Sequence, residues 1–406
     1  MKTRRWMVAF LLVCPLLARG DTTPHQELEK YDDGTIHFKV PLDSQGKRNG
    51  VYTAFFPGGK KIQEQAIYVH GDLSGPRQVS DEKGMLLNDE MWVKGRLVLP
   101  KSQRMIQAAR QQMLRDATAA VMKLGKISNP RAPKNDMLAR ALAKVNTYRY
   151  LCDLPSDVGL DDQEINVSQY ASELLVKVGH LTHTPEQPRG YDPTAYELGR
   201  QGCGHSNLFE GGDAVASVDA YMDDSDPGNI DRLGHRRWVL NPGMGKTGFG
   251  VAGKFSAMFS FDNSRTPIPD YDFVCFPPRG YCPRDLFNAS YAWSVSFNPQ
   301  KYQVSSDAKI DIYLVNASLV RANQPLAMTY SHVDLGGYGI PNAIIGRPRA
   351  LPATPGAVYE VVVSGVTSTK DATATKDATS APNPTNTTTN APNAPAGEIS
   401  YFVTFY

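Results

Sequence analysis

The spacing at which apolar residues recur changes twice along the chain. The order of these spacings restricts the fold more than any other feature of the sequence. Near the start, Ile36, Phe38 and Val40 alternate with polar residues, a pattern typical of a half-buried strand. From Ser102 the apolar residues recur every three or four positions, as on one face of a helix. From about residue 256 the alternation typical of strands returns. The sequence therefore predicts an α+β protein, and its 406 residues suffice for two to three domains.

Turn residues, helix caps and composition give boundaries for the parts. We expect a small β-rich module over 25–100, a helical connector over 101–135, a central domain over 136–262 and a β-sandwich over 263–406. Ser102 and Gly125 are suitable caps for a connector helix, and further helical segments begin near 136, 163 and 213. Residues 367–397 contain no Val, Ile, Leu, Met, Phe, Trp or Tyr, so we expect a disordered loop inside the sandwich.

The first twenty residues are typical of an export signal. Lys2, Arg4 and Arg5 precede an apolar run over 6–17, and Ala18-Arg19-Gly20 provides the small residues of a cleavage site. This run is too short to cross a bilayer, which takes about 20 apolar residues. No later stretch is long enough, so we expect a secreted or periplasmic protein with no transmembrane segment.

The net charge argues against nucleic acid as a partner. The chain has 43 Lys and Arg and 41 Asp and Glu, and four of the basic residues lie in the first twenty. Removal of that segment leaves 39 basic against 41 acidic side chains. A nearly neutral mature chain lacks the basic excess that binding to a phosphate backbone requires.

Four cysteines remain after the export signal, and an oxidising compartment favours disulfide bonds between them. Cys275 and Cys282 bracket a Pro-Pro-Arg-Gly turn, which favours a local bond and leaves Cys152 to pair with Cys203. The alternative is a zinc site, although the sequence contains no Cys-x-x-Cys motif.

Five short motifs lie in the central part of the chain. They are Asn-Thr-Tyr-Arg at 146–149, His-Thr-Pro at 183–185, Asn-Leu at 207–208, Gly-His-Arg-Arg-Trp-Val-Leu-Asn-Pro at 234–242 and Gly-Phe-Gly at 248–250. In this order they resemble the CAP superfamily, which includes cysteine-rich secretory proteins and plant pathogenesis-related proteins, in its bacterial form. The resemblance implies that the central domain is an α-β-α sandwich.

The resemblance also implies a cleft lined by two histidines and two acidic residues, which binds zinc in some members. By position, the histidines are His183 and His235, and Asp224 or its neighbour Asp223 replaces the second acidic residue. Neutral imidazoles from two loops can share one metal ion. The alternative is structural: both histidines hydrogen-bond to the main chain and hold two loops together.

The sequence departs from the family pattern at the first acidic residue. Ser206 stands where the family has Glu, and Asn207 follows it. His180 and His205 are candidate additional zinc ligands, because His180 is three residues from His183. The cleft residues are therefore His183, Ser206, Asn207, Asp224 and His235, and zinc is the one cofactor that the resemblance suggests.

These observations favour a binding protein without turnover, whose ligand is a lipid, a glycan or a protein. One alternative is a secreted hydrolase that uses His183 and His235 with a metal, or Ser206 with His235 and Asp224 as a triad. The chain lacks both the Gly-x-Ser-x-Gly elbow and the His-Glu-x-x-His motif, so we assign no catalytic residue. A second alternative is a surface or adhesion protein that binds through its β-rich parts.

Overall fold

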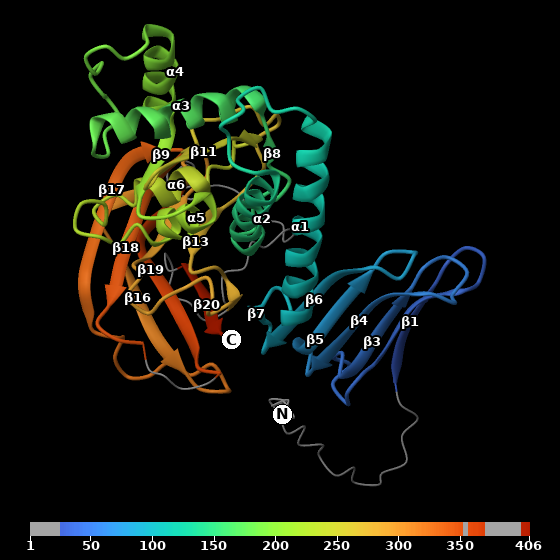
Figure 1. The fold of residues 1–406 in the computed structure, drawn as a ribbon. Coiled ribbons are helices and arrows are strands. Elements are labelled where there is room, and N and C mark those ends of the chain that lie inside the picture. Colours follow the sequence, from blue (N-terminus) through green and yellow to red (C-terminus); the bar gives the residue numbers. More distant parts are fainter. Residues whose placement is uncertain (1–24, 352–355, 370–398) are drawn as a thin grey trace, which may run out of the picture.

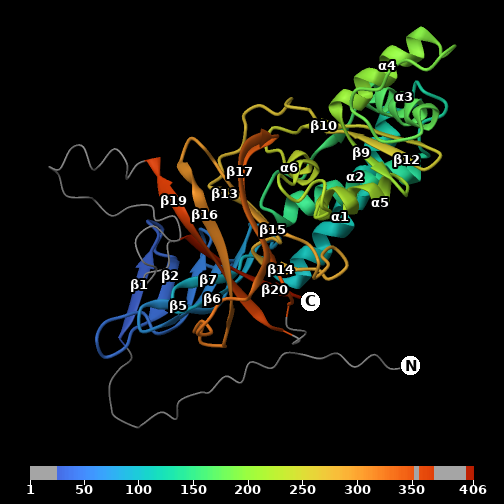
Figure 2. The same cartoon turned by 90° about the vertical axis from the view of Figure 1, so that its left-hand side faces the viewer.

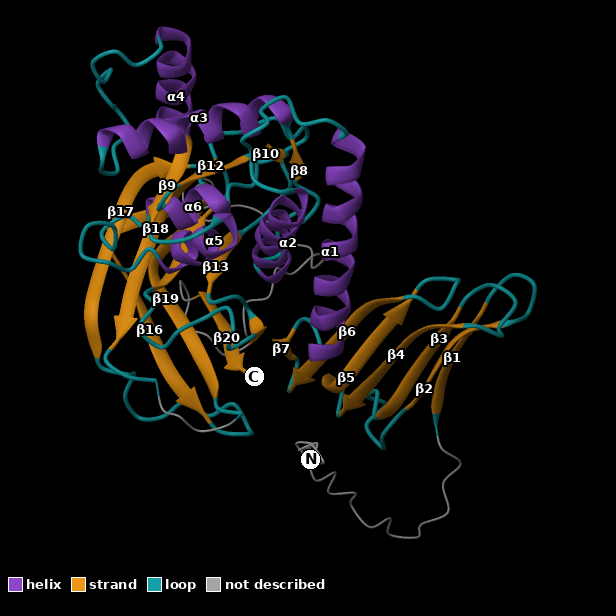
Figure 3. Cartoon of the chain, viewed as in Figure 1, coloured by secondary structure: helices purple, strands orange, loops and turns teal. Residues whose placement is uncertain are grey.

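The computed structural model describes residues 25–351, 356–369 and 399–406. The predicted export signal lies outside these ranges, as do residues 370–397 of the predicted disordered loop. The chain is a mixed α+β protein, which confirms the predicted class (Figure 1). Figure 3 shows the helices gathered between two groups of strands, in the order that the periods predict.

The first part of the chain forms one antiparallel sheet with its seven strands in sequence order. The strands are β1 (Gln26–Lys30), β2 (Ile36–Pro41), β3 (Gly50–Phe55), β4 (Ile62–Val69), β5 (Asp72–Ser80), β6 (Leu86–Val93) and β7 (Arg96–Leu99). In Figure 1 this sheet projects from the side of the molecule as a single layer. Its last strand makes the connection, since Val98 is buried with Val315 and Phe402 of the C-terminal part.

Six helices follow in the described residues. They are α1 (Gln103–Leu124), α2 (Asn135–Leu151), α3 (Asp162–Val178), α4 (Pro193–His205), α5 (Ala214–Asp223) and α6 (Gly234–Val239). The predicted caps of the connector helix are confirmed: Ser102 Oγ accepts a hydrogen bond from the Met105 amide at 3.2 Å, and Gly125 ends α1. The helices predicted near 136, 163 and 213 correspond to α2, α3 and α5, whereas α4 and α6 were not predicted.

Two small sheets lie among these helices. Strands β8 (Gly159–Leu160) and β10 (Lys246–Thr247) pair in parallel, and a three-stranded sheet has the order β11-β12-β9. Its strands are β9 (Ser206–Glu210), β11 (Phe249–Ala252) and β12 (Phe255–Phe259).

Helices cover both faces of the three-stranded sheet. On one face Leu208 and Ala257 are buried with Ala171 of α3 and Cys203 of α4. On the other face Phe209 packs edge to face on Tyr221 of α5, with 6.4 Å between the ring centroids. Figure 2 shows this layering: α3 and α4 lie on one side of β9 and β12, and α2 and α5 lie on the other.

The C-terminal part consists of two four-stranded sheets with the orders β13-β15-β18-β17 and β14-β20-β19-β16. The strands are β13 (Phe273–Phe276), β14 (Gly280–Cys282), β15 (Trp293–Phe297), β16 (Tyr302–Val315), β17 (Met328–Tyr338), β18 (Ile340–Pro348), β19 (Val358–Ser368) and β20 (Ile399–Phe405). The buried Trp293 of the first sheet contacts Tyr359 and Phe405 of the second, so the sheets face each other.

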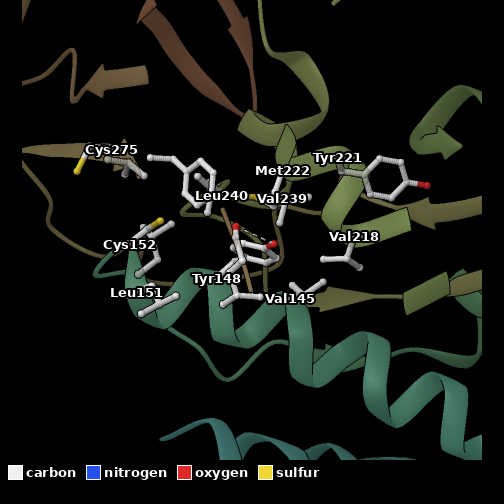
Figure 4. Packing of buried hydrophobic residues seen from close by; sticks show 14 of the residues in the cluster. Val145, Tyr148, Leu151, Cys152, Val218, Tyr221, Met222, Val239, Leu240 and Cys275 are labelled. Carbon is white, nitrogen blue, oxygen red and sulfur yellow. Dashed lines mark hydrogen bonds between the residues drawn. The ribbon is translucent and has the colours of Figure 1, made fainter. Parts of the chain in front are cut away.

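One hydrophobic cluster runs from the helices into these two sheets. Figure 4 shows part of it, where Val145 and Tyr148 of α2 point toward Val218 and Met222 of α5. The same cluster contains Trp293 and Tyr359, so the central and C-terminal parts share a core. None of the helices in the described ranges combines the length and apolarity that crossing a membrane needs.

The predicted disulfide bonds are not formed. Cys152, Cys203, Cys275 and Cys282 are all buried free cysteines. Cys152 belongs to the large cluster on the α2 side of the three-stranded sheet, whereas Cys203 is buried against α3 on the opposite side. The sheet thus separates the two cysteines that the sequence paired. Burial raises the pKa of the Cys275 thiol to about 12, which disfavours the reactive thiolate.

Candidate functional site

A cavity of about 510 Å³ opens beside β9. Four segments form its walls: the loop that follows α3, strand β9, the C-terminal end of α5 with the turn that follows it, and the first turn of α6. Its lining residues are Leu181, Thr182, His183, Leu208, Phe209, Glu210, Ala220, Tyr221, Asp223, Asp224, Ser225, Asp226, Asn229 and His235. We call this cavity the His183–His235 cleft, since it brings together the two histidines that the motifs singled out.

The imidazole of His235 is held from two sides. Its Nδ1 hydrogen-bonds to Asp224 Oδ1 at 2.8 Å, and the ring stacks on Tyr221 with 5.7 Å between centroids. Asp224 is buried at the C-cap of α5, and its second oxygen accepts a hydrogen bond from the Arg236 amide at 3.3 Å. A carboxylate on one ring nitrogen fixes the tautomer and leaves Nε2 to contact a ligand.

His183 is oriented by the main chain instead of by a carboxylate. Its Nδ1 lies 2.7 Å from the carbonyl oxygen of Cys203, the third residue from the end of α4. A carbonyl can only accept, so Nδ1 carries a proton and Nε2 is the ring nitrogen left to contact a ligand. This bond ties the loop after α3 to α4, which is the structural role that we considered for His183. The two roles are compatible, because His183 also lines the cleft.

Asn207 and Ser206 do not line the cleft. The Asn207 side chain donates to the carbonyl oxygen of His235 at 2.9 Å and accepts from Ser260 Oγ at 3.2 Å. Asn207 therefore positions the start of α6 on β9. Ser206 is buried, and its Oγ has no hydrogen-bond partner in the described part of the chain. The triad of Ser206, His235 and Asp224, which belongs to the alternative hydrolase function, is not assembled, because only the histidine and the aspartate are bonded.

The other two histidines do not join His183 and His235. His205 lines a second hollow of about 440 Å³ with His183, but His235 does not border it. The His205 ring stacks on Phe259 at 6.0 Å, and its Nδ1 bonds to the Gln201 carbonyl at 2.9 Å. His180 is exposed and borders neither hollow.

The predicted zinc site does not fit these positions. In the described ranges, no three His, Cys, Asp or Glu side chains lie where one metal ion could contact all of them. A protein zinc site takes at least three protein ligands. Asp224, the acidic residue nearest to His235, already accepts the hydrogen bond from that ring.

Several cleft residues were not predicted. Glu210 and Asp226 add two carboxylates, and Tyr221 supports the His235 ring. Tyr221 lies three positions after Val218 on the predicted buried face of the helix, so the helical period could have found it. Asp226 lies in a turn, where no period indicates which way a side chain points.

Comparisons of the chain with protein-family models, with curated proteins and with solved structures found no match.

Proposed function

We propose that this chain is an exported, non-catalytic binding protein whose central, CAP-like domain takes its ligand in the His183–His235 cleft. The observation that carries the proposal is that His183, from the loop after α3, and His235, from the first turn of α6, line one open cavity. The layers of α3, the three-stranded sheet and α5 support the CAP-like assignment, since the motifs imply an α-β-α sandwich. Export rests on the sequence of the first twenty residues.

Binding without turnover is favoured by the chemistry of the cleft. Asp224 and His235 form an acid–imidazole pair, but among the described residues no serine is bonded to the His235 ring. Ser206 does not line the cleft, and Ser225, which does, donates its hydroxyl to the Asp223 carbonyl at 2.6 Å. A hydrolase needs the nucleophile within hydrogen-bond reach of its base. The cleft instead offers imidazole nitrogens, carboxylates and the Phe209 and Tyr221 rings, which suits recognition of a polar ligand with some apolar surface.

A cavity-filling variant tests this proposal. Ala220 of α5 lines the cleft, and Ala216, one helical turn earlier, is exposed and does not. A library of lipids, glycans and peptides is screened by mass spectrometry for compounds retained by the full chain. We expect Ala220→Trp to weaken retention of the selected compounds at least tenfold and Ala216→Trp to leave it unchanged.

Two outcomes would contradict the proposal. Equal retention by wild type and Ala220→Trp would move the binding site away from the cleft. If a selected compound is recovered in chemically altered form, and only when the wild-type protein is present, the hydrolase is favoured. Circular dichroism and the unfolding midpoint of both variants show whether each is folded.

A further inference from the structure

Strand β9 borders the cleft with its edge. Leu208, Phe209 and Glu210 are consecutive and all three line the cavity, although side chains alternate between the faces of a strand. Leu208 is buried on the α3 and α4 side, and Phe209 packs on Tyr221 on the α5 side. The part of all three residues that faces the cavity is therefore their main chain. β9 is also the outer strand of its sheet, in the order β11-β12-β9.

The register of β9 shows which main-chain groups face outward. At one end the Ser260 amide donates to the His205 carbonyl at 3.0 Å, and at the other the Gly211 amide donates to the Lys254 carbonyl at 2.9 Å. In an antiparallel pair the bonded positions alternate, so the odd-numbered residues from 205 to 211 bond to β12. The amides and carbonyls of Leu208 and Glu210 consequently point away from β12, toward the cleft.

The carboxylates that line the cleft are not balanced by Lys or Arg side chains in the described part of its wall. Glu210, Asp223, Asp224 and Asp226 line it, and no Lys or Arg occurs among its described lining residues. Asp224 is paired with His235, and Glu210 forms an ion pair with Lys254 from outside the cavity. Asp223 is different, because its Oδ1 is buried without a hydrogen-bond partner in the described structure. Burial raises the pKa of Asp223, although a hydrogen bond from Ser225 and the positive charge of Arg236, which does not line the cleft, oppose this effect.

We infer that the ligand of the cleft is an extended peptide that adds a strand to the outer edge of β9 and places a Lys or Arg side chain against Asp223. An exposed strand edge offers main-chain hydrogen bonds to any extended chain, and the pockets beside it select the side chains. Asp223 lines the cleft and forms no ion pair within the described structure, so a cationic side chain there would supply a counter-charge for its carboxylate. This inference rests on the proposed function, of which it names the ligand class.

Backbone methylation of a peptide tests the strand addition. The probes are acetylated and amidated heptapeptides with Lys at the centre and random flanking residues, from which the tightest binder is chosen. Each of its amides is then N-methylated in turn, and the dissociation constant is measured by fluorescence anisotropy. We expect a loss of at least tenfold at two amides in alternate positions, which would donate to the carbonyls of Leu208 and Glu210, and less than twofold at the other amides.

Side-chain exchange tests the role of Asp223. Replacement of the central Lys by norleucine is expected to weaken binding to wild type at least tenfold. Asp223→Asn is expected to weaken the Lys peptide by a similar factor and to leave the norleucine peptide unchanged, which also shows that the variant is folded. The matched control is Asp231→Asn, because Asp231 is exposed, pairs with Arg232 and lies outside the cleft.

The outcomes separate this inference from the proposed function. The inference is overturned if none of the heptapeptides binds. It is also overturned if N-methylation of every amide weakens binding equally, or if the Lys and norleucine peptides bind with equal affinity. If Ala220→Trp still blocks binding of a lipid or glycan in that case, the cleft remains the binding site and only the ligand class is wrong. If no compound depends on Ala220, both proposals fail.

Discussion

Glu164 stands in the first turn of α3 with one carboxylate oxygen, Oε2, buried and without a hydrogen-bond partner in the described structure. Burial is the main cause that raises the pKa of Glu164 to about 8, and the negative charges of Asp262 and Asp161 add to it. The ordinary pKa of this group is 4.5. The folded chain therefore retains a proton that the unfolded chain loses as the pH rises between 4.5 and about 8.

The sign of this linkage gives a first prediction at the residue scale. The protonated Glu164 side chain contributes to the free energy of unfolding below pH 4.5, and this contribution is lost as the pH rises through about 8. Glu164→Gln, which imitates the protonated form, should leave the free energy of unfolding unchanged at low pH. Above pH 8 it should raise that free energy by about 1–2 kcal/mol, less than the full shift implies because part of the carboxyl contacts solvent.

Urea unfolding across this pH range measures the effect. Glu186→Gln is the control, because Glu186 is exposed in the loop after α3. Parallel stability–pH curves for wild type and Glu164→Gln would show that the buried oxygen has a partner in solution.

Also at the residue scale, the motifs predicted which histidines share a cavity better than they predicted which other side chains line it. The convergence of His183 and His235 agrees with the arrangement that the resemblance implies. Ser206 and Asn207 were both placed in the cleft, but neighbouring strand residues point to opposite faces, and neither lines the cavity. The strand alternation was visible in the sequence. The partner of each side chain was not, because it depends on contacts such as Asn207 with the distant His235 carbonyl.

At the scale of elements, α4 illustrates why a helix was missed. Asp192 and Pro193 are suitable N-terminal residues, and Asp192 Oδ1 does accept a hydrogen bond from the Ala195 amide at 2.8 Å. Glycines at 199, 202 and 204 lower the helix propensity of this segment and mask its period. The structure gives two of them a packing reason, since a Cβ on Gly199 would lie 2.9 Å from the Tyr170 carbonyl oxygen of α3. A Cβ on Gly202 would lie 2.1 Å from the Val167 carbonyl oxygen of α3.

The two glycines of α4 near this contact should therefore respond in opposite ways to alanine. Gly202→Ala should lower the free energy of unfolding by about 2–3 kcal/mol, because α3 and α4 must separate to admit the methyl group. Gly204→Ala is the matched control. A Cβ there comes no nearer than 3.9 Å to the His183 carbonyl oxygen, and alanine should stabilise the helix by about 0.5–1 kcal/mol.

Chemical denaturation of both variants checks this prediction. The carbonyl of Cys203, next to Gly202, accepts the His183 hydrogen bond. Gly202→Ala displaces α4 from α3 and should consequently also shift the NMR signal of the His183 Cε1 proton. Equal stability of the two variants would mean that α3 and α4 are not in close contact.

At the scale of the whole molecule, the periods predicted three parts but not how they join. Arg96 of β7 forms an ion pair with Glu360 of β19, although 264 positions separate them. Glu360 also accepts a hydrogen bond from Arg321 at 3.0 Å, and its side chain is fully buried. No local pattern reveals a partner so distant in the chain. The N-terminal sheet therefore looked independent in the sequence, whereas its last strand packs on the C-terminal part.

Glu360 provides a test of this junction. Burial raises the pKa of its carboxyl, but the hydrogen bonds from Arg321 and Arg96 outweigh burial and hold the pKa below its usual value. The resulting stability is present above pH 4.5 and is lost as the pH falls below it. Glu360→Gln should lower the free energy of unfolding at neutral pH by about 2–3 kcal/mol, because the two guanidinium groups lose their shared counter-charge.

Glu360→Gln should also loosen the structure locally, at the junction between β7 and β19. Amide hydrogen exchange in β7 should accelerate in Glu360→Gln, since Arg96 holds that strand to β19, while exchange in α4 should stay unchanged. Glu197→Gln, which breaks an exposed pair with Arg200 on α4, should change the unfolding free energy by less than about 0.5 kcal/mol. If β7 exchanges at the wild-type rate in Glu360→Gln, the apolar contact of Val98 with Phe402 suffices to hold the N-terminal sheet in place.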